Sequence, residues 1–127
     1  MILDLNHVNI VTTRLEETRA FYKRVLGLEA GYRPPFDFDG AWLYAGDKPL
    51  IHLQVPGSSA IGGTEERGAS GPLDHASFEV ADIAAARASL DANGIAYRAF
   101  TSPDGRNDQL FFRDPNGVVI ELIARAA

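Results

Sequence analysis

The sequence predicts an α+β protein made of two tandem βαβββ units, because the two halves of the chain repeat each other. His7 and His75 stand in the first strand-like run of each half, 68 positions apart, and His52 and Glu121 stand in the last run, 69 positions apart. Between these positions each half has one helix-like segment followed by strand-like runs. A repeat in both the apolar pattern and the reactive residues is typical of a duplicated structural unit.

The first half opens with a strand and a helix. Residues Leu5–Val11 alternate like a half-buried strand, which places Val8 and Ile10 on one face and His7, Asn9 and Val11 on the other. An amphipathic helix is predicted for Leu15–Leu26. Thr13 and Glu16 have the spacing of a capping box, in which each side chain satisfies a free backbone N–H of the first turn.

Three further strands complete the first half and are predicted at Leu28–Tyr32, Ala41–Tyr44 and Leu50–Val55. In the last of these, His52 and Gln54 alternate with aliphatic residues and therefore share one face. The composition then shifts to glycine, serine and charged residues over 56–72, which predicts a surface connection. The first unit thus spans about 1–55 and the second about 73–125.

The second half repeats this order of elements. A strand that begins at His75 is followed by a predicted helix over Ile83–Asn93, with Asp82 as its N-cap. Gly94 follows this helix as Gly27 follows the first, 67 positions earlier, and both positions suit the left-handed conformation that ends a helix. The drift of one or two positions is what short loop insertions produce.

The last strands are predicted at Tyr97–Thr101, Gln109–Arg113 and Val118–Ile123. The sequence Asp-Pro-Asn-Gly over 114–117 suits a three-residue hairpin loop that ends on a left-handed Gly117. This loop sets Phe111 opposite Glu121, so that Leu110 and the other aliphatic residues of both strands point away from them.

One face of the predicted sheets therefore collects polar and aromatic residues, whereas the opposite face is aliphatic and suits helix packing. The polar face holds the four candidate metal ligands His7, His52, His75 and Glu121. The same face has the residues expected to line a substrate pocket, which are Trp42, Tyr44, Gln109, Phe111 and Arg113. Arg113 is a candidate contact for an anionic substrate, whereas Arg33 and Arg98 are expected to be solvated or paired.

The composition limits the classes of function. A length of 127 residues with 46% hydrophobic content suits one domain over 1–127, and each half is too small to be expected to fold alone. The net charge of −5, without a basic run, disfavours nucleic acid. No apolar run approaches the roughly 20 residues that span a bilayer, so a cytoplasmic protein with no membrane partner is expected. Without cysteine, any metal must be bound by nitrogen and oxygen.

Three imidazoles and a carboxylate are a donor set for a divalent first-row ion. Zinc, nickel, cobalt, manganese and iron(II) all accept these ligands, so the donor types leave the metal open. Four protein ligands in a six-coordinate site leave positions for substrate oxygens. His52 has a second interpretation, as an acid or base beside the metal. Glu121 has few other interpretations, since an unpaired carboxylate in an apolar strand is costly.

Several segments together resemble the vicinal oxygen chelate superfamily of glyoxalases, bleomycin-resistance proteins and dioxygenases. The similar segments are Leu5–His7, Phe21–Tyr22, Leu26–Gly27, Asp74–His75 and most of Phe112–Leu122. A narrower resemblance to a glyoxalase I-like branch of plants and bacteria rests on Phe36–Trp42, Ile51–Leu53 and Asp108–Phe111.

The resemblance implies a U-shaped mixed sheet with its helices on the convex face, a divalent metal inside it, and a homodimer. It implies that the ligands come from the first and last strands of each unit, here His7, His52, His75 and Glu121. Bacterial glyoxalase I-type members usually have glutamate where His52 stands, and there a metal-bound carboxylate shuttles the proton.

The function expected from these features is a glyoxalase I-like lyase or isomerase that chelates vicinal oxygens of a small substrate. Glu121 would act as ligand and base, and His52 as a second proton-transfer group. The runner-up is a ring-cleaving dioxygenase with iron(II) on His7, His75 and Glu121. A binding protein that sequesters a small molecule or antibiotic without turnover is a third candidate, and fosfomycin-type thiol transfer is a fourth.

Overall fold

The structure, a computed structural model, describes residues 1–57 and 71–126. The chain divides into two compact units, Met1–Gly68 and Ala69–Ala127, and the described residues of each form an α+β arrangement of one helix and one four-stranded mixed sheet. The predicted βαβββ order is therefore confirmed in both halves. The predicted connection over 56–72 lies mostly outside the described residues, and a shared core for the two units stays a prediction.

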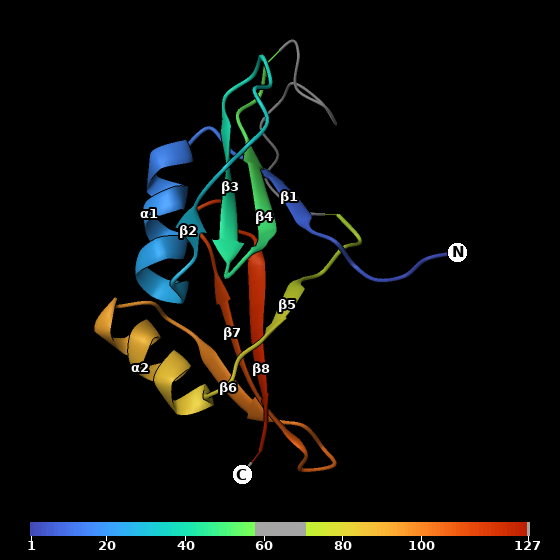
Figure 1. The fold of residues 1–127 in the computed structure, drawn as a ribbon. Helices are drawn as coiled ribbons and strands as arrows, with labels where there is room; N and C mark the ends of the chain where they lie inside the picture. The colour runs from blue at the N-terminus through green and yellow to red at the C-terminus, as the bar shows by residue number, and fades with distance from the viewer. Residues whose placement is uncertain (58–70, 127) are drawn as a thin grey trace. The chain divides into compact units, whose positions relative to one another are not determined.

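In the first unit, one helix lies against the sheet (Figure 1). Its elements are β1 (Val8–Val11), α1 (Leu15–Leu26), β2 (Glu29–Ala30), β3 (Gly40–Ala45) and β4 (Lys48–Gln54). The strand order is β1-β4-β3-β2, with β1 parallel to β4 and the other pairs antiparallel. The first and last strands of the unit are therefore neighbours, although about 40 residues separate them in the sequence.

The helix α1 has the predicted bounds but not the predicted N-terminal cap. Its N-cap is Arg14, without a side-chain cap, so the predicted capping box of Thr13 and Glu16 is wrong. The helix begins one residue later than that box requires, because the Thr12 hydroxyl accepts the Arg14 N–H at 2.9 Å and turns the chain there. The helix ends as predicted, with Gly27 at φ 71° and its N–H bonded to the Lys23 carbonyl.

The second unit repeats this topology with the order β5-β8-β7-β6. Its elements are β5 (Ala76–Glu79), α2 (Ile83–Ala92), β6 (Arg98–Thr101), β7 (Asn107–Arg113) and β8 (Val119–Arg125). The Asp82 side chain caps α2 by accepting the N–H groups of Ala84 and Ala85, as predicted. Gly94 follows with φ 66°.

The first histidine of each unit lies just outside the strand in which the sequence places it. His7 precedes β1 and His75 precedes β5, because the parallel ladders begin one residue later, at the pairs Val8–Ile51 and Ala76–Ile120. The two histidines therefore occupy equivalent positions, each one residue before the first strand of its unit begins.

The hairpin between β7 and β8 forms as predicted. Gly117 has φ 81°, its N–H binds the Asp114 carbonyl at 3.1 Å, and Phe111 pairs with Glu121. The aliphatic and aromatic residues on the other face are at most 4% exposed; they are Leu110, Phe112, Ile120 and Leu122. Among the described residues, no helix combines the length and apolar character needed to cross a membrane.

Candidate metal and substrate site

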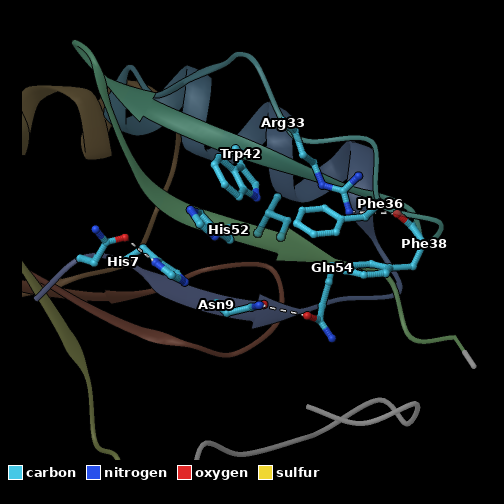
Figure 2. A pocket seen from close by; sticks show the side chains of 10 residues that line it. His7, Asn9, Arg33, Phe36, Phe38, Trp42, His52 and Gln54 are labelled. Carbon is cyan, nitrogen blue, oxygen red and sulfur yellow. Dashed lines mark hydrogen bonds between the residues drawn. The ribbon is translucent and has the colours of Figure 1, made fainter. Parts of the chain in front are cut away.

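In the first unit the structure brings His7 and His52 into contact. Their rings stack with centroids 3.7 Å apart and planes 12° apart, and Trp42 stacks on His52 at 3.9 Å (Figure 2). Strand pairing explains the stack, since Trp42 lies directly opposite His52 across β3 and β4, while His7 enters from the start of the neighbouring β1. The result is a column of three rings.

The environment of His52 keeps its imidazole neutral. The residue is 8% exposed, and burial lowers the pKa of His52 to about 4, with the positive charge of His7 as the next largest cause. Its Nε2 is buried without a hydrogen-bond partner among the described residues. A neutral imidazole with a free buried nitrogen is a candidate metal ligand or proton acceptor.

In the second unit the structure brings His75 and Glu121 together. Glu121, from β8, is 5% exposed, and its Oε2 lies 3.5 Å from His75 Nε2. The Gln109 amide, from the neighbouring β7, donates to the other carboxylate oxygen at 2.6 Å. The carboxylate is therefore held in one orientation by a neutral donor.

The residue that precedes His7 and the residue that precedes His75 each orient the following imidazole ring. His7 Nδ1 lies 2.8 Å from Asn6 Oδ1, and His75 Nδ1 lies 2.8 Å from Asp74 Oδ2. Since both oxygens accept, each Nδ1 carries the proton and each Nε2 keeps its lone pair in the neutral ring. Such partners commonly fix the tautomer of metal-binding histidines. Sequence reasoning missed this role, although Asn6 and Asp74 repeat at the same 68-residue offset.

These donors fit a divalent metal ion. The His75 Nε2 lone pair and the Glu121 carboxylate oxygen face each other at 3.5 Å, an arrangement that repels unless a cation or proton lies between them. Two donors that each lie about 2.1 Å from one ion are separated by roughly 3 to 3.5 Å. In the first unit, the parallel rings of His7 and His52 have lone pairs in nearly parallel planes. One of those rings must turn before both can bind the same ion.

Each unit by itself supplies two of the four predicted ligands. Within either unit, the described residues contain no group of three or more histidine, aspartate or glutamate side chains that could hold a metal. The site with all four ligands would need donors from both units, and that site stays a prediction.

The predicted pocket residues have different surroundings. Trp42 lines a cavity, whereas Tyr44 lies beyond a β-bulge and its hydroxyl donates to the Tyr32 carbonyl at 2.6 Å. Phe111 contacts His75 edge-on with ring centroids 5.5 Å apart. Arg113 is exposed and donates to the Gly117 carbonyl.

The cavity is lined by residues of the first unit and has a volume of about 380 Å³. Small-molecule sites commonly begin near this size. Its lining residues are Asn6, His7, Asn9, Arg33, Phe36, Phe38, Trp42, His52, Leu53 and Gln54. Sequence reasoning missed Arg33, Phe36 and Phe38 as lining residues. The available signal was the alternation of phenylalanine and aspartate over 36–39, outside any predicted strand.

A comparison with known protein families identifies the superfamily of this chain. The family model of the Glyoxalase/Bleomycin resistance protein/Dioxygenase superfamily matches residues 4–122, which include all four candidate ligands. The chain belongs to this superfamily. Members of the superfamily typically use a divalent metal ion, in agreement with the donor types found in both units.

Individual relatives are similar over nearly the whole chain. Glyoxylase I 4 of Arabidopsis thaliana is 34% identical over 95% of this chain and 70% of the relative. An ethylmalonyl-CoA/methylmalonyl-CoA epimerase of Cereibacter sphaeroides is 32% identical over 96% of this chain and 98% of the relative. The solved structure of a glyoxylase/bleomycin resistance protein/dioxygenase domain from Frankia sp. EAN1pec has the same fold. It has a TM-score of 0.75 at 22% identity, over 98% of this chain and 99% of that one.

Proposed function

We propose that this protein is a metal-dependent, glyoxalase I-like enzyme that moves a proton at the carbon next to a carbonyl group of a small substrate. The observation that carries the proposal is the environment of Glu121. Its carboxylate is buried, one oxygen accepts from Gln109, and the other faces His75. A buried carboxylate held by a neutral amide is a suitable base, because little reorganisation is needed before it accepts a proton.

The proposed ligands of one divalent ion are His7, His52, His75 and Glu121. Zinc, nickel, cobalt, manganese and iron(II) all suit this donor set, and the two units supply it either within one chain or across a homodimer. When bound, the ion would polarise a substrate carbonyl and so make the adjacent proton more acidic.

The remaining roles follow from the protein's own groups. Gln109 orients Glu121 by donating to one of its oxygens. His52, which is neutral because its pKa is about 4, is a candidate second group for proton transfer when it is not bound to metal. Asn6 and Asp74 keep His7 and His75 in the tautomer that leaves Nε2 free.

The two named relatives support this class of reaction. An epimerase inverts a carbon centre, and inversion beside a carbonyl requires a proton to leave and return at that carbon. One relative is a glyoxylase I and the other is an epimerase of acyl-CoA thioesters, so chains similar to this one are associated with different substrates.

Deuterium exchange tests the proposal directly. The metal-reconstituted protein is incubated in D₂O with lactoylglutathione and, separately, with methylmalonyl-CoA, and deuterium at the carbon beside the carbonyl is measured by mass spectrometry. We expect exchange with one of the two substrates. Replacement of the base, Glu121→Gln, should slow it by roughly 10²- to 10⁴-fold. The same change at exposed Glu17 on α1 is the control and should leave the rate unchanged.

Three results would reject proton transfer as the function. Oxygen uptake with a catechol by the iron(II)-loaded protein would favour the dioxygenase. Fosfomycin protection in cells without exchange would favour thiol transfer. Tight binding of a small molecule without turnover of any of these substrates would favour a sequestering protein.

A further inference from the structure

The cavity of the first unit contains a guanidinium group whose charge no carboxylate balances within the described residues. Arg33 Nη2 donates to the Phe38 carbonyl at 2.9 Å, and Nε is buried without a hydrogen-bond partner in this part of the chain. Arg33 forms no ion pair with any described residue, even though Asp37 and Asp39 are close in sequence. Exposed Arg113 also forms no ion pair among the described residues, but Arg33 differs from it in having a buried guanidinium nitrogen.

The surrounding residues hold this group in place. The guanidinium carbon lies 5.0 Å from the ring centre of Phe36 and 5.1 Å from that of Phe38, within cation–π range (Figure 2). Gly40 provides space, because a Cβ there would lie 2.9 Å from Arg33 Nη2. These contacts position the charge, but none of them neutralises it.

We propose that Arg33 binds the carboxylate of the substrate, so that the cavity selects small carboxylates with a flat, apolar body. This inference rests on the proposed function and names the substrate class of that site. No acidic residue is among the described residues that line the cavity, and Phe36 and Trp42 supply flat apolar walls. A guanidinium suits a planar carboxylate because its N–H groups and the two oxygens lie in one plane.

The position of Arg33 assigns substrate binding and proton transfer to different residues. Arg33 and His52 line the same cavity. A carboxylate bound at Arg33 would place the rest of a small substrate beside His7 and His52 within a volume of about 380 Å³.

Binding of two probes of equal shape tests this assignment. The full chain is held in EDTA at pH 8, so that the probe has no metal to coordinate. Benzoate and its uncharged analogue benzamide are titrated, and binding is followed by quenching of Trp42, the single tryptophan. We expect benzoate to bind at least about tenfold more tightly, as a charged hydrogen bond implies.

Variants assign the preference to one residue. Arg33→Met should abolish the difference between the two probes, whereas Arg33→Lys should retain part of it. The control Arg24→Met, at an exposed position of α1, should retain all of it. Equal affinity for the two probes, no binding of either, or a benzoate preference that survives Arg33→Met would overturn the proposal. The first two of these results require no variant to fold.

The result of the benzoate and benzamide titrations does not depend on which reaction the protein catalyses. A benzoate preference that depends on Arg33, found together with no deuterium exchange, would reject the proton-transfer function and keep the carboxylate subsite. Deuterium exchange without any benzoate preference would do the reverse.

Discussion

His52 is the residue whose surroundings differ most from those of an ordinary histidine. It lies between the rings of His7 and Trp42, is 8% exposed, and has a buried Nε2 without a hydrogen-bond partner among the described residues. Burial disfavours its charged form, and a proton on His7 disfavours it further. The same environment that makes His52 a candidate ligand also makes its protonation costly.

Acid should therefore destabilise the metal-free protein through His52. The pKa is about 4 in the folded chain and 6.5 in the unfolded chain, so only the unfolded state gains the proton between these values. Above pH 6.5 this group leaves the free energy of unfolding unchanged. As the pH falls from 6.5 toward 4, the free energy of unfolding decreases progressively. We expect roughly 2 kcal/mol less free energy of unfolding at pH 5 than at pH 7.5 from this residue. Urea unfolding in EDTA at both pH values measures the loss.

The variant His52→Gln isolates this effect from other titrating groups. Its change in free energy of unfolding between the two pH values should be smaller than that of the wild type by the same roughly 2 kcal/mol. Identical pH dependence in wild type and variant would show that His52 titrates normally in the folded protein.

At the scale of elements, the β7–β8 hairpin determines where Glu121 points. Asp114 is 5% exposed, and its Oδ1 accepts the backbone N–H groups of Asn116 and Val118 at 2.8 and 2.9 Å. These bonds close the loop that pairs Phe111 with Glu121. A shift of one residue in this pairing would turn Glu121 to the opposite face of the sheet.

Loss of the Asp114 side chain should destabilise this hairpin. Asp114→Ala leaves two N–H groups without their acceptor in a partly buried turn, which costs about 1–3 kcal/mol of unfolding free energy. Asp114→Asn keeps an acceptor oxygen and should lose less. Urea unfolding measures both variants. An equal loss in the two would mean that the negative charge, rather than the acceptor geometry, stabilises the turn.

At the scale of the whole molecule, each unit carries half of the candidate donor set. His7 and His52 belong to the first unit, and His75 and Glu121 belong to the second. If one ion binds all four, a change in the second unit must remove metal from the first. This dependence separates a shared site from two independent weak ones.

Trp42 provides a signal for this test because it stacks on His52. Nickel or cobalt should quench Trp42 in the wild type, and His75→Ala should abolish the quenching together with the bound metal found by elemental analysis. Metal at a hundred times its dissociation constant should add about 2.7 kcal/mol to the stability of the wild type. Asp91→Ala, on α2 and exposed, is the control. Quenching that persists in His75→Ala would show that the first unit binds metal alone.

The four variants of the candidate ligands should also differ in an informative way. Loss of stoichiometric metal from His7→Ala, His52→Ala, His75→Ala and Glu121→Ala would support the complete set. Retention of metal in His52→Ala would leave that residue as an acid or base beside the ion.

Local rules in the sequence were sufficient for the βαβββ repeat, for both helix ends at Gly27 and Gly94, and for the register that sets Phe111 opposite Glu121. Alternation, left-handed glycines and turn chemistry each depend on a few neighbouring residues, so they can be read without the fold. The family and the type of metal donors follow from the same residues.

The surroundings of those residues became apparent only from the folded chain. The segment with Arg33, Phe36 and Phe38 has no strand or helix period, so its packing against Gly40 could not be predicted. The β-bulge after Leu43 likewise alters the register at Tyr44, which bonds to Tyr32. Contacts of this kind depend on how distant segments fit together in space. Periodicity along the chain carries no information about that fit.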